Sequence, residues 1–451
     1  MTRPERLIIF TRPPVPGQVK TRLIPALGPE GAAELHRHLA QGVLAWGLKL
    51  ALLRPLGIEV RHDGGNPEEM RAWLGPGPFL RPQGPGDLGQ RMERALGEAL
   101  QEGASRVILV GTDLPGLTDQ HLNRALEALN ERDLVLGPAT DGGYYLVGLT
   151  RPAPEIFSGI SWGGPRVLAQ TLAAAQTAGL EPALIPGLSD LDRPEDLAGL
   201  GHAPAPPALE RVTGLITVII PALNEEPNLG YVVESALRGQ GVEVIVVDGG
   251  SQDRTYALAR ALGVKALMSF AGRARQMNLG AALARGEYLL FLHADTLLPS
   301  GWDGQLRDML NQPGVVAGAF QFGLDAGGPA YRLLERLVAW RSRWLQLPYG
   351  DQAICLRASM FENLGGYAEI PIMEDFELVR RLAHRGRLAL APAAVRTSAR
   401  RWRVRGLWRT TLINQAIVLG YGLGVPPARL HRWYGRSRPT RPGPPSPPGK
   451  N

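Results

Sequence analysis

The chain has 451 residues, more than one hydrophobic core usually serves, so at least two domains are expected. Charged residues make up 20% and hydrophobic residues 44%, which is typical of a folded globular protein. A single cysteine excludes an intrachain disulfide, and the absence of a run of about 18 uncharged apolar residues predicts no membrane-spanning helix.

The net charge of +7 hides a strong asymmetry along the chain. Residues 378–451 contain 15 Arg, one Lys and no acidic residue, so they carry +16 and the rest of the chain carries −9. A basic end on an acidic body predicts a local anion site for a diphosphate, a nucleic acid or a membrane face. The lone Cys355 fits a reducing compartment, and the N-terminus lacks the apolar core of a signal peptide. We therefore expect a cytoplasmic protein.

The first half begins with a short buried strand expected at residues 7–10. It leads into a turn-rich loop that ends in Lys20 and Arg22, and such a loop can wrap a phosphate chain. The GxxxxGK(S/T) spacing of a P-loop is absent. A solvated surface loop would explain the same residues. Helical patterns follow at residues 29–51 and 87–101.

Acidic residues follow the next expected strands. Residues 106–110 form a buried-strand pattern that ends just before Asp113, and a strand at 133–136 precedes a glycine-rich turn that contains Asp141. Asp192 lies in a loop near the end of this half. Acids at several strand or loop ends favour a metal–nucleotide site, although helix caps and turns would explain any one of them.

These segments resemble a bacterial family of nucleotidyltransferase-like glycosyltransferases with the GT-A fold, and also the molybdopterin and phospholactate nucleotidyltransferases. The resemblance rests on VKTRL, VGTDLP, DGGYYLVGL and DLDRPEDL and covers about residues 6–200. It implies that Lys20 and Arg22 face nucleotide phosphates. It also implies that Asp113, with Asp141 or Asp192, faces a metal.

A Pro- and Ala-rich stretch at residues 201–213 lacks periodicity and predicts a linker between domains at 1–200 and 214–435. The two domains echo each other. GDLGQRMERALGEALQEG precedes RVILVGTDLP, and GRARQMNLGAALARG precedes EYLLFLHADTLLP. Each has a Gly-led turn, a helix, a Gly, a buried strand and an Asp, which predicts two copies of one architecture. The usual alternation of turns, helices and strands in α/β proteins would also produce this order.

Strands expected at residues 216–220, 242–247 and 288–292 indicate a doubly wound, mainly parallel α/β sheet. Polar residues follow each strand: Asn224 and Glu225, then Asp248 and Asp253, then His293 and Asp295. Ligands bind beyond the carboxyl ends of such strands, and Mg²⁺ often takes one or two carboxylates plus phosphate oxygens. Asp295 is interpreted as the metal residue under a nucleotide diphosphate, although a capping Asp would look the same.

Glu374 and Asp375 stand at the start of an expected helix. The helix dipole stabilises a carboxylate there and keeps it ionised. Such a group can act as general base toward a sugar hydroxyl, provided that it comes within about 3 Å. A plain N-terminal acid is the alternative. Further on, Arg401 could bind a departing diphosphate or be a solvated surface arginine.

Together these segments resemble the family 2 glycosyltransferases over about residues 215–435. The matching motifs are IPALNEE, VVDGGSQDRT, GRARQMN, HADT, GGYAEIPIMEDFELVRRL and ARRW. The resemblance implies a GT-A fold, a nucleotide-sugar donor, transfer with inversion and a divalent cation, Mg²⁺ or Mn²⁺. The implied site residues are Asn224, Glu225, Asp248, Asp253, Arg273, Asn278, Arg401 and Trp402 for the donor, Asp295 and His293 for the metal, and Asp375 as base beside Glu374.

The sequence departs from the family pattern in two places. The usual DxD motif is His293-Ala294-Asp295, and imidazole suits later divalent metals better than Mg²⁺. The usual QxxRW motif has Ser398 in place of Gln. The motifs GRARQMN and HADT are most similar to those of a subgroup associated with arsenosugar biosynthesis. We expect a small-molecule or lipid-like acceptor.

Two alternatives for the first half stay open from the sequence: it could be a sugar-phosphate nucleotidyltransferase, or a non-catalytic nucleotide-binding module. A third alternative, nucleic-acid binding through the Arg-rich end, is not expected, because the arginines form no known motif and the body is acidic. The apolar stretch at residues 407–425 is expected to be a packed closing helix, with a surface-lying membrane helix as the alternative. Residues 436–451 are expected to be disordered.

Overall fold

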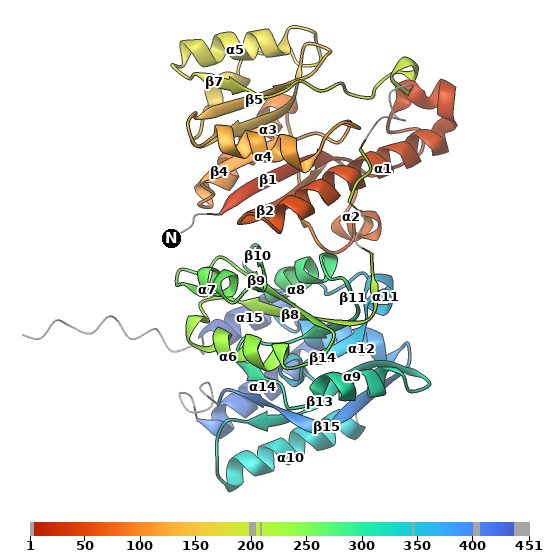
Figure 1. Ribbon diagram of the computed structural model, residues 1–451, viewed down its shortest axis with the longest axis vertical. Helices are drawn as coiled ribbons and strands as arrows, with labels where there is room; N and C mark the ends of the chain where they lie inside the picture. The colour runs from red at the N-terminus through yellow and green to blue at the C-terminus, as the bar shows by residue number, and fades with distance from the viewer. Residues whose placement is uncertain (1–3, 198–203, 208–209, 345–346, 400–405, 437–451) are drawn as a thin grey trace, which may run out of the picture.

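The computed structural model describes residues 4–197, 204–207, 210–344, 347–399 and 406–436 (Figure 1). Two α/β units follow one another along the chain, and each has a mixed, mostly parallel sheet flanked by helices. The predicted fold class is confirmed. Within the described residues, no helix is long and apolar enough to cross a bilayer.

The N-terminal unit contains a sheet with the order β3-β2-β1-β4-β6-β5-β7. Its strands are β1 (Glu5–Thr11), β2 (Leu56–His62), β3 (Phe79–Pro82), β4 (Arg106–Val110), β5 (Leu134–Pro138), β6 (Tyr144–Leu149) and β7 (Pro182–Leu184). Its helices are α1 (Ile24–Ala51), α2 (Pro67–Leu74), α3 (Leu88–Gln101), α4 (Asp119–Ala128) and α5 (Val167–Thr177). All residues of β1 are buried, as expected for a parallel strand covered on both faces.

The C-terminal unit contains a sheet with the order β10-β9-β8-β11-β14-β13-β15-β12. Its strands are β8 (Val212–Ala222), β9 (Val242–Asp248), β10 (Lys265–Met268), β11 (Gly286–Phe291), β12 (Thr296–Leu297), β13 (Val315–Leu324), β14 (Ile354–Arg357) and β15 (Arg387–Thr397). Its helices are α6 (Glu226–Leu237), α7 (Thr255–Ala261), α8 (Arg273–Ala282), α9 (Trp302–Leu310), α10 (Pro329–Trp344), α11 (Ala358–Asn363), α12 (Glu374–Ala383), α14 (Leu407–Gly422) and α15 (Pro427–Arg436).

The two sheets share one topology. Read from β3 and from β10, the first seven strands of each sheet have three parallel pairings, two antiparallel pairings and one further parallel pairing, and the C-terminal sheet adds the antiparallel β12. In each unit a helix precedes the central strand: α3 precedes β4, and α8 precedes β11. The chain enters α3 through Gly86 (φ +104°) and α8 through Gly272 (φ +138°). A side chain is disfavoured at these backbone angles, which explains the glycine in both copies. The predicted repetition of one architecture is confirmed.

The loop that precedes α12 is anchored against the N-terminal unit. Glu369 forms ion pairs with Arg71 of α2 at 3.0 Å and with Arg275 of α8 at 3.1 Å. Phe79 of β3 packs against Phe270, with ring centroids 4.3 Å apart. The segment that carries Glu374 and Asp375 is therefore supported from both units.

Candidate active site

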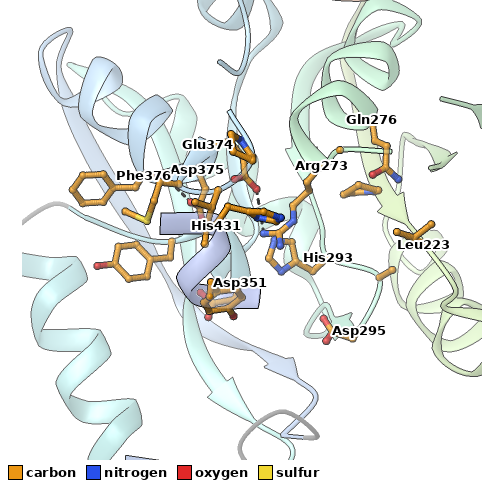
Figure 2. Close-up of a pocket in the computed structure, with 18 of the residues that line it drawn as sticks. Leu223, Arg273, Gln276, His293, Asp295, Asp351, Glu374, Asp375, Phe376 and His431 are labelled. Carbon is orange, nitrogen blue, oxygen red and sulfur yellow. Dashed lines mark hydrogen bonds and ion pairs between the residues drawn. The ribbon is translucent and has the colours of Figure 1, made fainter. Parts of the chain in front are cut away.

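A cavity of about 500 Å³ opens at the carboxyl end of the C-terminal sheet (Figure 2). Its wall is built by the turns after β8 and β11, the start of α8, the entrance to α12, and helices α14 and α15. Six predicted site residues line it: Glu225, Arg273, His293, Asp295, Glu374 and Asp375. Folding thus brings together groups that lie up to 150 positions apart in the sequence.

Asp375 is held in place by backbone amides. The N–H group of Gly350 donates to Oδ2 at 2.7 Å, and the N–H group of Phe376 donates to Oδ1 at 2.7 Å. A Cβ atom on Gly350 would lie 2.9 Å from this Oδ2 and 2.9 Å from Nε2 of His293. Only glycine leaves room for this approach. A carboxylate oxygen accepts more than one hydrogen bond, so Asp375 keeps capacity to accept a proton.

Glu374 is buried and forms an ion pair with Arg273 at 3.3 Å. Burial raises the pKa of the Glu374 carboxyl, and the Asp375 carboxylate adds to the rise while the Arg273 guanidinium opposes it. Burial therefore works against the ionised form of Glu374, whereas the Arg273 guanidinium favours it. The ion pair positions the Arg273 guanidinium at the wall of the cavity.

Asp248 ends β9 and is only 1% exposed. Its Oδ1 accepts hydrogen bonds from the amides of Gly250 at 2.8 Å and Ser251 at 2.7 Å. Its Oδ2 is buried and has no hydrogen-bond partner among the described residues. Burial raises the pKa of this carboxyl. Asp248 does not line the cavity itself, but the side-chain amide of Gln276, which does, donates to the carbonyl of the neighbouring Val247 at 2.7 Å.

Three further predicted donor-binding residues, besides Asp248, lie outside the cavity lining. Asn224 ties two strand-end turns together, because its Oδ1 accepts from the Gln252 amide at 2.8 Å. Asp253 accepts from the Thr255 amide at 2.9 Å. Asn278 is fully buried, and its side-chain amide exchanges two hydrogen bonds of 2.9 Å with the Tyr367 backbone. The assignment of Asn278 to the donor is therefore corrected: its polar atoms hold a loop.

Asp295 and His293 line the cavity at the end of β11 (Figure 2). Within the described ranges, no cluster of three or more His, Cys, Asp or Glu side chains could hold a metal alone. A cation here would need oxygens from a ligand. One carboxylate with diphosphate oxygens is a donor set that fits Mg²⁺ or Mn²⁺.

Other lining residues were not assigned to the site by the sequence argument: Gln276, Tyr349, Asp351, Thr397, His431 and Tyr434. Asp351 directly follows Gly350, but no local pattern marks it. His431 and Tyr434 belong to α15, and only the packing of this helix brings them to the cavity. Arg401 and Trp402 lie outside the described residues.

The N-terminal unit has a charged cluster at the corresponding sheet edge. The Lys20 ammonium, whose side chain is 2% exposed, lies 2.9 Å from Asp113 and 3.8 Å from Asp192. Arg22 lies 2.6 Å from Asp192, and His36 lies 3.8 Å from Asp113. Burial raises the pKa of the Asp113 carboxyl, but His36 and Lys20 together bring it below its ordinary value.

Four of the five residues predicted for the N-terminal site are thus adjacent. Asp141 has no ion pair with them among the described residues and lies in a turn, where its Oδ1 accepts from the Gly143 amide at 2.9 Å. A metal ion between Asp113 and Asp192, which the resemblance implies, would compete with the Lys20 ammonium, because this group already contacts both carboxylates.

Each of the two units matches a known protein family. The family described as glycosyl transferase family 2 matches residues 217–366. The C-terminal unit is a family 2 glycosyltransferase domain. A second family, described as an uncharacterized protein conserved in bacteria (DUF2064), matches residues 48–164. The predicted pairing of a nucleotidyltransferase-like domain with a family 2 glycosyltransferase domain is confirmed, whereas the arsenosugar subgroup stays a prediction.

Individual relatives match parts of this chain. A candidate nucleotide-diphospho-sugar transferase from Desulfovibrio desulfuricans G20 is 36% identical, over 44% of this chain and 87% of that chain, with a TM-score of 0.42. A 2-phospho-L-lactate guanylyltransferase from Methanopyrus kandleri is 37% identical over 94 residues, which is 20% of this chain and 46% of that protein. A dolichol-phosphate mannosyltransferase from Pyrococcus furiosus is 36% identical over 74 residues, which is 16% of this chain and 21% of that protein. The chain therefore spans less than half the length of these two curated relatives.

Proposed function

We propose that the family 2 domain transfers a sugar from a nucleotide-sugar donor to an acceptor hydroxyl, with inversion at the anomeric carbon. The observation that carries this proposal is the Asp375 carboxylate, which two backbone amides orient in a cavity shared with Arg273 and Asp295. Its position at the carboxyl ends of the strands is where open α/β sheets bind ligands.

The donor's nucleoside part would bind beside β9. The Oδ2 atom of Asp248 is a buried acceptor without a partner among the described residues, and leaving such a group unsatisfied costs about 1–3 kcal/mol. Because Asp248 is buried and lies outside the cavity lining, the turn after β9 would have to move for an N–H or O–H group of a base or ribose to reach this oxygen.

The donor diphosphate would lie between this end of the site and Asp375, beside Asp295 and His293. A divalent cation bound by Asp295 and diphosphate oxygens, Mg²⁺ or Mn²⁺, would supply positive charge at the leaving group. Arg273 adds a fixed positive charge at the same wall of the cavity, and Glu374 keeps its guanidinium in place at 3.3 Å.

Asp375 would act as the general base. It takes the proton from the acceptor hydroxyl as that oxygen bonds to the anomeric carbon, while the bond from that carbon to the diphosphate oxygen breaks on the opposite face. One displacement of this kind inverts the anomeric configuration. General base catalysis of this type contributes about 10²- to 10⁴-fold in rate.

We infer a second activity for the N-terminal domain: formation of a nucleotide sugar from a sugar phosphate and a nucleoside triphosphate. Lys20 and Arg22 converge at the sheet edge that corresponds to the cavity of the other domain. The 37% identity to a guanylyltransferase supports this choice over a non-catalytic module. The product would then serve as donor for the family 2 domain.

The test of sugar transfer uses the full chain. Nucleotide sugars are screened for thermal stabilisation with and without Mg²⁺ or Mn²⁺, and the stabilising donor is offered with small-molecule and lipid-like acceptors. We expect Asp375→Asn to keep the stabilisation but to lose about 10²-fold or more in transfer rate. Asp308→Asn, an exposed acid on α9, is the matched control and should transfer normally. Normal turnover by Asp375→Asn would remove Asp375 as the base.

A further inference from the structure

Helix α14 exposes an apolar stripe on its outer face. Leu412 and Leu419 have exposed fractions of 68% and 66%, and Leu423, the C-cap residue that follows the helix, has one of 85%. Ala416 is exposed as well. An α-helix returns to the same face after about 3.6 residues, so these four residues lie along one line. We call them the outer stripe.

The inner face of α14 is also apolar. Ile417 and Val418 line the cavity and pack with Phe376 of α12 in one hydrophobic cluster. A helix that is apolar on both faces is normally covered on both, by a protein core or by a membrane. Its 16 residues fall short of the roughly 20 needed to span a bilayer. This length suits a helix that lies in the membrane interface.

The charges around the outer stripe favour an anionic surface. Arg409 on α14 and Arg429 and Arg432 on α15 are exposed, and Trp433 beside them is 49% exposed. No acidic residue follows Glu377 in the sequence. Arginine is attracted to anionic headgroups, and tryptophan prefers the boundary between lipid and water. An apolar stripe on a helix that carries an exposed arginine, beside a helix with two more, matches an anionic lipid surface better than a neutral protein partner.

A second helix repeats this pattern. Leu333, Leu337 and Trp340 of α10 are exposed at helical spacing, with the exposed Arg336 beside them. Leu334, on the opposite face, packs in one hydrophobic cluster with Leu407 at the start of α14. Helix α10 lies at the end of the molecule remote from the N-terminal unit (Figure 1). Helices α10 and α14, which are joined through one hydrophobic cluster, therefore both expose leucine and arginine side chains.

We propose that the outer stripe of α14, with the exposed faces of α15 and α10, docks this protein on an anionic phospholipid surface. The inner faces of α14 and α15 line the cavity, so docking holds the cavity beside the lipid. An acceptor carried by the bilayer would then enter without crossing water. That consequence for the acceptor rests on the proposed function, whereas the docking does not.

The test is co-sedimentation of the full chain with vesicles of phosphatidylcholine, alone or mixed equally with phosphatidylglycerol. We expect binding to the mixed vesicles that weakens as salt is added. The triple variant Leu412→Ser, Leu419→Ser and Leu423→Ser should partition at least about tenfold less, because the apolar side chains that would insert into the lipid are lost. The control variant Leu53→Ser, Leu184→Ser and Leu237→Ser changes three leucines that are exposed on other surfaces and should bind like the wild type.

Thermal midpoints and the molar mass in solution are measured for both variants, which separates docking from misfolding. Absence of binding to mixed vesicles would overturn the proposal, as would equal losses in the two variants or equal binding to neutral vesicles. Self-association that the outer-stripe variant abolishes, without vesicle binding, would instead assign the face to a second copy of the chain. The readout needs no sugar transfer, so it stands if the proposed function fails.

Discussion

The backbone amide of Gly350 donates to Oδ2 of Asp375 at 2.7 Å, in a gap that has no room for a side chain. A Cβ atom there would lie 2.9 Å from both Asp375 Oδ2 and His293 Nε2. We predict that Gly350→Ala displaces the carboxylate and lowers the transfer rate about 10- to 100-fold, because misplacement of about 1 Å costs this much. Donor affinity should change little.

The measurement is the rate of transfer at saturating donor, together with the donor dissociation constant. Gly304→Ala on α9 is the matched control, since its Cβ would meet nothing within 4 Å. An unchanged rate in Gly350→Ala would show that the orientation of Asp375 by this amide is not needed for catalysis.

Asp248 offers a test that separates binding from stability. Its pKa is raised by burial, so its neutral form contributes stability that is present at low pH and lost as the pH rises through the folded-state pKa. Asp248→Asn keeps the oxygen that accepts from Gly250 and Ser251 and removes the charge. We expect unfolding free energy at pH 7 at least equal to that of the wild type, with the difference shrinking toward about pH 3.9.

The same variant should bind a nucleotide-sugar donor about tenfold or more weakly, because an acceptor for the nucleotide is altered. Urea unfolding at several pH values and donor titration provide the two readouts. A stability loss that is equal at all pH values, with donor affinity unchanged, would assign Asp248 a purely structural role.

The substitution of imidazole for one carboxylate at residue 293 predicts a metal preference. If His293 contacts the cation, the wild type should lose activity with a chelator and recover more with Mn²⁺ than with Mg²⁺. His293→Asp should shift the ratio of the two rates toward Mg²⁺ by several-fold. Stabilisation of the protein by donor plus each metal gives a second readout, and a ratio identical in both proteins would show that residue 293 does not contact the metal.

Lys20 balances two carboxylates in the N-terminal domain. We expect Lys20→Met to lower the unfolding free energy by about 1–3 kcal/mol at pH 7. The pKa of Asp113 is depressed in the folded protein, so the stability linked to it is present above the ordinary carboxyl pKa and lost as the pH falls through the folded value. The effect of the substitution should therefore fade below about pH 4.

Lys49→Met is the control for this variant, because Lys49 forms a surface ion pair with Asp119 at 3.0 Å that contributes at most about 1 kcal/mol. In the full chain, Lys20→Met should abolish pyrophosphate release from a nucleoside triphosphate and sugar phosphate, while transfer from a supplied donor continues. Asp375→Asn should show the reverse. Loss of both activities in either variant would contradict two separate sites.

The amino-acid sequence alone determined where the chemistry could sit. Hydrophobic runs mark the buried strands, and polar residues that follow them mark the strand ends, so Asp248 and Asp295 could be placed at one sheet edge. Asp375 could be placed only at the start of a helix. The repeated order of turn, helix, strand and Asp also predicted the shared topology of the two sheets, because both signals are local.

Only the tertiary structure decided which of these residues share a space. It paired Lys20 with Asp192, brought His431 and Tyr434 of α15 to the cavity, and turned the amide of Asn278 to a backbone loop. It also packed Gly350 against the side chains of Asp375 and His293. Contacts of this kind depend on how distant helices pack and on which backbone groups need a partner, and neither is written in the spacing of residues along one segment.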